Sequence, residues 1–116
     1  MKLITPPKLL MVAAVVELAT GFGLLLAPGV VSSVLLGIAG TEVTNLFARF
    51  FGIALIALGV ACWPSPATVA ALRSMQVYNG AIALYLAYIG VFVSSGLLLW
   101  PAVVFHGVMT VLLLRR

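Results

Sequence analysis

Four apolar stretches, each about as long as a membrane-spanning helix, occupy most of this chain. They cover residues 9–27, 44–63, 75–93 and 97–114. At about 1.5 Å of helix rise per residue, roughly 20 residues cross the hydrocarbon core of a bilayer. Only 7% of the residues are charged, too few to cover the surface of a water-soluble domain. The sequence therefore predicts an all-α protein, a bundle of four transmembrane helices surrounded by lipid.

Helix stop and start signals separate these spans. Pro28 and Gly29 close the first span, and Ser65 followed by Pro66 favours the start of the third helix. After the first span, apolar residues recur at helical spacing over residues 30–38, which predicts a short interfacial helix in the first outer loop. We expect the whole 116-residue chain, positions 1–116, to form a single membrane domain.

The first apolar stretch also has features of a secretory signal peptide, because Lys2 and Lys8 precede it. The apolar core of a signal peptide is shorter than this stretch, and Glu17 in its middle is unusual for one. We therefore expect the stretch to remain as a membrane span.

The basic residues predict the orientation, because Lys and Arg that flank membrane spans stay on the cytoplasmic side. With the amino terminus inside, five of them are cytoplasmic and only Arg49 lies towards the outside. The five are Lys2, Lys8, Arg73, Arg115 and Arg116. We expect both termini in the cytoplasm and the inner membrane of a bacterium as the location. Because the basic residues form no stripe, nucleic acid is not an expected partner.

A few polar residues lie inside the predicted spans, where an unpaired charge is costly. Counting along the helices places Glu17 and His106 near mid-membrane and Arg49 roughly two turns nearer the outside. We expect a buried cluster of Glu17, Arg49 and His106, with Asn79 as a separate polar group nearer the cytoplasm. A hydrogen bond to a neighbouring helix is a commoner role for such an asparagine than substrate binding. The Glu17–Arg49 pair fits a structural ion pair that sets helix register equally well. Tyr78 is a further candidate for ligand binding or proton coupling, although packing is its commoner role.

Small residues also mark one seam of the second span. Gly52 and Gly59 lie on it with Asn45 and Arg49, and glycines at such positions allow two helices to approach closely. We expect this seam to pack against another helix.

Residues with the chemistry for catalysis or metal binding are scarce. The single Cys62 excludes an internal disulfide, a CxxC redox pair and a multi-cysteine metal site. No nucleotide-binding loop is visible, and His106 alone does not fill both axial positions of a haem. The residues predict no catalytic group, no metal and no bound cofactor, and leave a quinone or a lipid as the molecule that a groove at Glu17 would hold.

The first helix resembles a helix of the DoxX-like superfamily of small four-helix membrane proteins. The similar residues are Glu17-Leu18-Ala19-Thr20-Gly21 and Leu24-Leu25-Leu26-Ala27-Pro28-Gly29. Three further patches are similar to small bacterial membrane proteins associated with that group: Ala48-Arg49 with Gly52, Tyr78-Asn79, and Trp100-Pro101 with His106. The resemblance implies a four-helix membrane fold. It also implies either a part in a thiosulfate:quinone oxidoreductase or an accessory, chaperone-like role.

Three functions follow as hypotheses. The first is a non-enzymatic accessory or binding module for a lipid, a quinone or a partner subunit of a larger membrane complex. The second is a proton-coupled transporter similar to the small multidrug resistance type, in which Glu17 exchanges protons with a substrate and a homo-oligomer encloses the path. The third, a membrane subunit of a quinone-linked oxidoreductase, rests on the resemblance alone. We expect the first, and catalysis by this chain alone is not expected.

Overall fold

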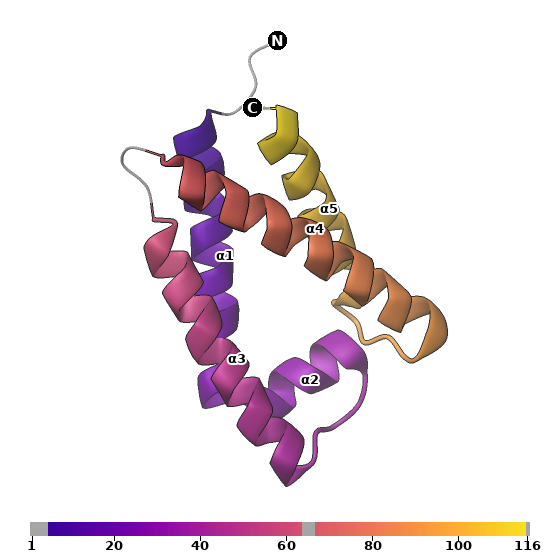
Figure 1. Ribbon diagram of the computed structural model, residues 1–116. Coiled ribbons are helices and arrows are strands. Elements are labelled where there is room, and N and C mark those ends of the chain that lie inside the picture. Colours follow the sequence, from indigo (N-terminus) through magenta and orange to yellow (C-terminus); the bar gives the residue numbers. More distant parts are fainter. Residues whose placement is uncertain (1–4, 64–66, 116) are drawn as a thin grey trace.

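The computed structural model describes residues 5–63 and 67–115, which form helices joined by short turns (Figure 1). The helices are α1 (Pro6–Leu26), α2 (Pro28–Leu36), α3 (Glu42–Ala61), α4 (Val69–Phe92) and α5 (Leu99–Arg115). By length and composition, α1, α3 and α4 can cross a membrane, whereas α5 is a shorter apolar helix of 17 residues. The prediction of an all-α protein is confirmed for the described part of the chain.

A proline and a glycine bound the short helix α2. Pro28, predicted to end the first helix, is also the first residue of α2, a position where its missing N–H and fixed φ are tolerated. The short helix therefore begins two residues before the predicted 30. It ends at Gly37, whose φ of 75° is in the left-handed region that glycine enters without strain.

Threonine side chains cap the next two helices. The Oγ1 atoms of Thr41 and Thr68 each accept a hydrogen bond from the backbone N–H three residues further on, at 3.2 and 3.1 Å. Ser65 and Pro66, the predicted start of the third helix, lie outside the described residues, and α4 begins at Val69. Local capping thus sets both helix starts.

The bundle consists of two helix pairs, α1 with α3 and α4 with α5 (Figure 1). The first turn of α1 and the last turn of α5 lie at the same end of the molecule, and α2 lies towards the other end (Figure 1). There, α2 is bonded to the turn between α4 and α5. Ser94 Oγ donates to the Leu36 carbonyl at 2.7 Å, and the amides of residues 96 and 98 donate to other α2 carbonyls. Helix α2 therefore bridges the two pairs.

Helices α1 and α3 approach closely where their glycines face each other. A Cβ atom added to Gly52 would lie 2.6 Å from the carbonyl oxygen of Gly21. One added to Gly59 would lie 2.6 Å from the Leu18 side chain. The predicted packing role of Gly52 and Gly59 is confirmed, and Gly21 on α1 completes the contact.

A buried apolar cluster lies at the end of the bundle where α1 begins and α5 ends (Figure 1). Leu10 of α1, Met75 of α4 and Leu113 of α5 are fully enclosed and belong to one cluster. This cluster holds the two helix pairs together at that end. Towards α2 the pairs diverge (Figure 1).

Candidate functional site

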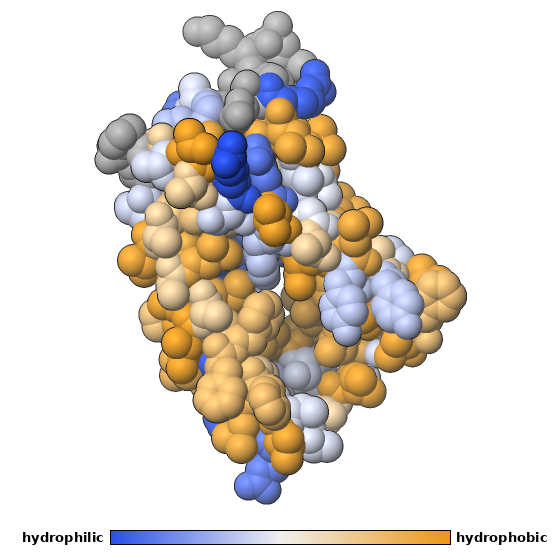
Figure 2. All heavy atoms as spheres, viewed as in Figure 1, coloured by the Kyte–Doolittle hydropathy of each residue, from blue (hydrophilic) through white to orange (hydrophobic). Residues whose placement is uncertain are grey.

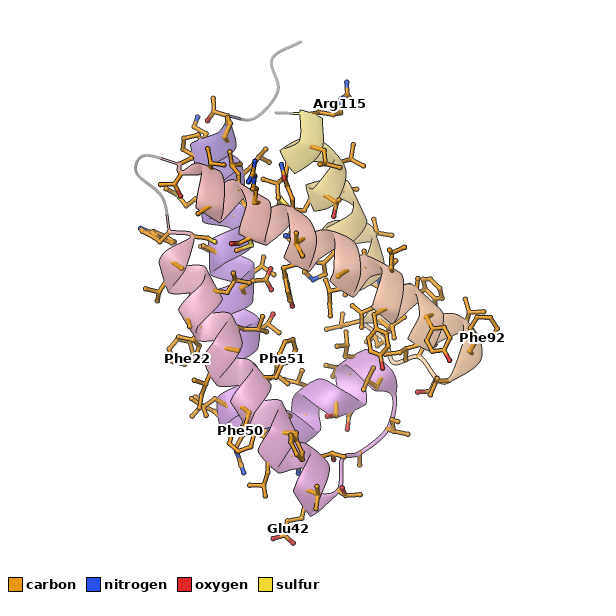
Figure 3. The ribbon with its side chains drawn as sticks, in the orientation of Figure 1. Phe22, Glu42, Phe50, Phe51, Phe92 and Arg115 are labelled. Atoms are coloured by element: carbon orange, nitrogen blue, oxygen red, sulfur yellow. The ribbon has the colours of Figure 1, made fainter. Side chains whose placement is uncertain are left out.

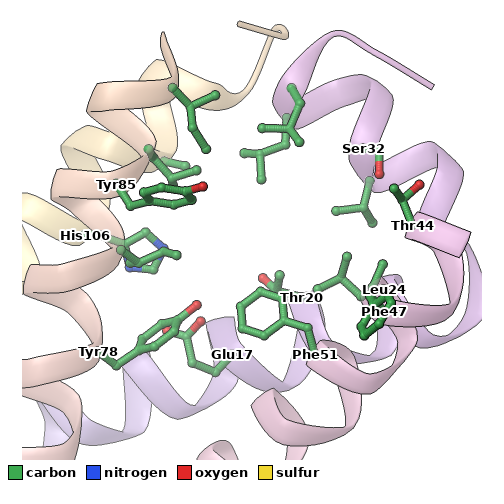
Figure 4. Close-up of a pocket in the computed structure, with 18 residues that line it drawn as sticks. Glu17, Thr20, Leu24, Ser32, Thr44, Phe47, Phe51, Tyr78, Tyr85 and His106 are labelled. Carbon is green, nitrogen blue, oxygen red and sulfur yellow. The ribbon is translucent and has the colours of Figure 1, made fainter. Parts of the chain in front are cut away.

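A cavity of about 440 Å³ lies in the space between the two helix pairs (Figure 4). All five helices contribute to its lining, which is mostly apolar. Its polar side chains include Glu17, Thr20, Tyr78, Tyr85 and His106. The molecular surface is hollowed between α3 and α4 (Figure 2). The cavity is thus a concave, largely apolar site with a few polar groups, as is usual for ligand sites.

Glu17 is the most unusual of these groups. It lies in the middle of α1 on the buried face of the helix, and only 1% of its surface is exposed. Its Oε2 atom is enclosed and has no hydrogen-bond partner among the described residues. The carboxyl group lies on the cavity wall, on the side of Tyr78 (Figure 4). An enclosed polar atom without a partner costs about 1–3 kcal/mol, and more when it is charged. A bound molecule that donates a hydrogen bond to the carboxyl group at the cavity wall would offset this cost.

His106 and Asn79 form a buried hydrogen-bonded pair across α4 and α5. The Nδ1 atom of His106 lies 2.6 Å from Asn79 Oδ1. The Asn79 Nδ2 atom donates to the Met75 carbonyl at 2.9 Å, so the amide oxygen is the atom that faces the imidazole. Nδ1 must then carry the proton, and Nε2 of the neutral ring is left as an acceptor. The pair orients the imidazole at the cavity.

Arg49 does not lie with Glu17 and His106 at the cavity. The predicted cluster of Glu17, Arg49 and His106 is therefore wrong in including Arg49. The Arg49 side chain is exposed, and its Nε donates to the Leu25 carbonyl at 3.1 Å. The last carbonyls of a helix lack intrahelical partners and lie at the negative end of its dipole, which suits a cation. The end of α1 therefore binds the arginine, and the alternative of a structural Glu17–Arg49 ion pair is wrong as well.

The remaining predicted residues also differ in part from their expected places. Asn79 is not a separate polar group, because it is the hydrogen-bond partner of His106. The expected hydrogen bond from Asn79 to a neighbouring helix is confirmed, since His106 belongs to α5. Tyr78 lines the cavity, and its ring meets the His106 ring edge to face with centroids 5.9 Å apart. Tyr85, which was not among the candidate site residues, lines the cavity too. Its spacing of seven residues from Tyr78 is the signal that places both on one face of α4.

A variant of Asn79 tests the buried pair. Asn79→Leu leaves the Nδ1–H group of His106 without its acceptor and is expected to lower the free energy of unfolding by about 1 kcal/mol. In a protein that also carries His106→Phe, Asn79→Leu should lower the free energy of unfolding by much less. Cys62 provides the measurement, because it is the single cysteine and only 1% exposed, so a thiol-specific dye reports unfolding in detergent. Equal losses in both backgrounds would show that the two residues are not coupled.

The chemistry of the site rests on one carboxyl group, one imidazole and the hydroxyl groups of two tyrosines, two threonines and a serine. Within the described residues, no three His, Cys, Asp or Glu side chains come together as metal ligands. Comparison with models of protein families, with curated proteins and with solved structures finds no match, so the function has to be argued from the site itself.

Proposed function

We propose that this protein is a non-enzymatic membrane module that binds an amphiphilic molecule, a lipid or a quinone, in the cavity between its helix pairs. The observation that carries the proposal is the enclosed, unpartnered carboxyl oxygen of Glu17 on the wall of a mostly apolar cavity. The volume of about 440 Å³ lies within the range of roughly 300–1,000 Å³ that is usual for ligand sites.

The proposal includes four membrane spans. Helix α5 has 17 residues, about the shortest length that spans a bilayer, and would be the fourth span, with α2 at the outer interface. Lys8, Arg73 and Arg115 belong to helix segments at the end where α1 begins and α5 ends, whereas Glu42 lies at the opposite end (Figure 3). The positive-inside rule then favours both termini in the cytoplasm, as in a bacterial inner-membrane protein.

Access from the bilayer is part of the same proposal. Phe47 and Phe51 of α3 and Tyr85 of α4 line the cavity, yet they are 65%, 41% and 60% exposed. They would form an aromatic rim where the cavity opens between α3 and α4. A molecule dissolved in the bilayer would enter sideways past this rim, without crossing water.

Membership of the DoxX-like superfamily is a further part of the proposal. Two positions that carry the resemblance have roles consistent with it: Glu17 faces the interior of the bundle, and Pro28 separates α1 from α2. An accessory subunit of a larger membrane complex, or a homo-oligomer, would use the bound molecule without reacting with it. The fold alone assigns no activity.

Two alanine variants on α3 test the binding function. Ala48 lines the cavity, whereas Ala57 is exposed. Native mass spectrometry of protein purified in mild detergent is expected to show a bound molecule in wild type and in Ala57→Phe. Ala48→Phe should retain at least about tenfold less, because the phenyl ring occupies the site.

Equal occupancy in all three proteins, or none in any, would contradict the proposal. Reconstituted vesicles provide a second test. Proton-coupled substrate movement that is abolished by Glu17→Gln would instead identify a transporter.

A further inference from the structure

The cavity has hydrogen-bond acceptors that lack donors. Glu17 Oε2 has no partner among the described residues, and Nε2 of His106 is an acceptor because Nδ1 is bonded to Asn79. The hydroxyl groups of the lining, on Thr20, Ser32, Tyr78 and Tyr85, can donate or accept. A ligand that pairs with Glu17 and His106 therefore brings donors of its own. The carbonyl oxygens of a quinone are acceptors only and do not meet this need.

The cavity also lacks a cation. Among the described residues, its lining includes no lysine or arginine, and Arg49, which follows the lining residue Ala48 on α3, is bonded to the Leu25 carbonyl instead. A carboxylate in an apolar surrounding needs a positive charge or several donors to offset its desolvation. An ammonium group supplies both, because it has a positive charge and up to three N–H donors. The aromatic rings of Tyr78 and Tyr85 add favourable surfaces for a cation.

The rest of the cavity sets the shape of the ligand. Leu24, Phe51 and Ile82 belong to an apolar lining that suits a hydrocarbon chain. A volume of about 440 Å³ lies near the lower end of the usual range of roughly 300–1,000 Å³, which suits one chain rather than two.

Building on the proposed binding function, we infer that the ligand is a single-chain amphiphile with a primary ammonium head, which donates a hydrogen bond to Glu17.

Photo-crosslinking tests this inference on the full chain in phosphatidylcholine vesicles. Three probes share one alkyl chain with a diazirine at its middle and differ only in the head: primary ammonium, trimethylammonium or methyl ether. Labelling of the cavity lining, mapped by mass spectrometry, is normalised to the lipid-facing Val60, which is 64% exposed. In wild type, the ammonium probe should label the cavity at least about tenfold more than the ether. The trimethylammonium probe should label less than the primary amine, because it has no N–H group.

The two glutamates of the chain provide a variant and its matched control. In Glu17→Gln, labelling by the ammonium probe should fall to the level of the ether probe, while labelling by the ether is unchanged. Glu42→Gln should keep the full preference, because Glu42 is exposed at the start of α3, away from the cavity lining. Protection of Cys62 from a thiol dye shows whether each variant is folded. The wild-type comparison of the three heads needs no variant and tests the inference by itself.

Competition identifies the source of the ammonium group. If an unlabelled alkyl amine suppresses labelling and lysophosphatidylethanolamine does not, the ligand is a free amine. If both compounds suppress labelling, the ammonium group belongs to a lipid headgroup.

Equal labelling by the ammonium and ether probes would overturn the inference and leave the binding function standing. Trimethylammonium labelling as strong as that of the primary amine would overturn the hydrogen bond to Glu17. No cavity labelling by any probe would overturn the binding function together with the inference.

Discussion

Replacing Gly52 by alanine is expected to lower the free energy of unfolding by about 1–3 kcal/mol. The new Cβ would lie 2.6 Å from the carbonyl oxygen of Gly21 and 3.0 Å from the backbone nitrogen of Leu25. Both are backbone atoms of α1, so the two helices have to separate rather than a side chain rotate. The gain in helix propensity, about 1 kcal/mol for glycine to alanine, is too small to offset this. Dye labelling of Cys62 during heating in detergent measures the effect.

Gly107→Ala is the matched control for this experiment. Nothing lies within 4 Å of a Cβ added to Gly107, although this glycine also lies inside a helix, α5. The control is expected to be neutral or stabilising by up to about 1 kcal/mol. Because Gly21 lies one turn from Glu17, separation of α1 from α3 should also weaken ligand binding in Gly52→Ala but not in Gly107→Ala. Similar stabilities of the two variants would contradict the close packing of α1 and α3.

Replacing Glu17 by methionine is expected to raise the free energy of unfolding by about 1–3 kcal/mol. The change removes a carboxyl group whose Oε2 is enclosed without a partner, and it keeps an unbranched side chain of similar length. The same variant should lose the preference for an ammonium head. Stability would thus increase while binding is lost, as expected where a site retains an unfavourable group for function.

Replacing Glu42 by methionine is expected to have the opposite effect and to lower the free energy of unfolding. Glu42 is exposed in the first turn of α3, where a carboxylate interacts favourably with the helix dipole. Removing this carboxylate should lower the free energy of unfolding by about 0.3–1 kcal/mol. If Glu17 were a structural residue with a buried ionic partner, its replacement would instead cost about 3–5 kcal/mol. Destabilisation of that size in Glu17→Met would contradict a binding role for this residue.

Much of the helical architecture could be predicted because its causes are local. The length of each apolar stretch depends only on neighbouring residues, and so do the caps and the prolines that bound the helices. The short helix predicted over residues 30–38 is present as α2, displaced by two residues, because a proline can start a helix as well as end one. The close approach through Gly52 and Gly59 was also predictable, because both lie on one seam of a single helix.

The partners of the polar residues were not predictable in the same way. Counting residues gives the depth of a side chain along its helix, but it gives neither the rotation of the helix nor the identity of its neighbour. Arg49 had two favourable partners, a buried carboxylate and the free carbonyls at the end of α1, and the packing of α1 against α3 placed the carbonyls within its reach. Asn79 and His106 are 27 residues apart, and only the pairing of α4 with α5 brings them to 2.6 Å.

Sequence alone thus determined that the chain forms apolar helices and that one of them carries a carboxyl group at its middle, because hydrophobicity and residue identity need no tertiary contact. The tertiary structure decided that this carboxyl group lies on the wall of a cavity without a partner, because that depends on how two helix pairs meet at one end and diverge at the other.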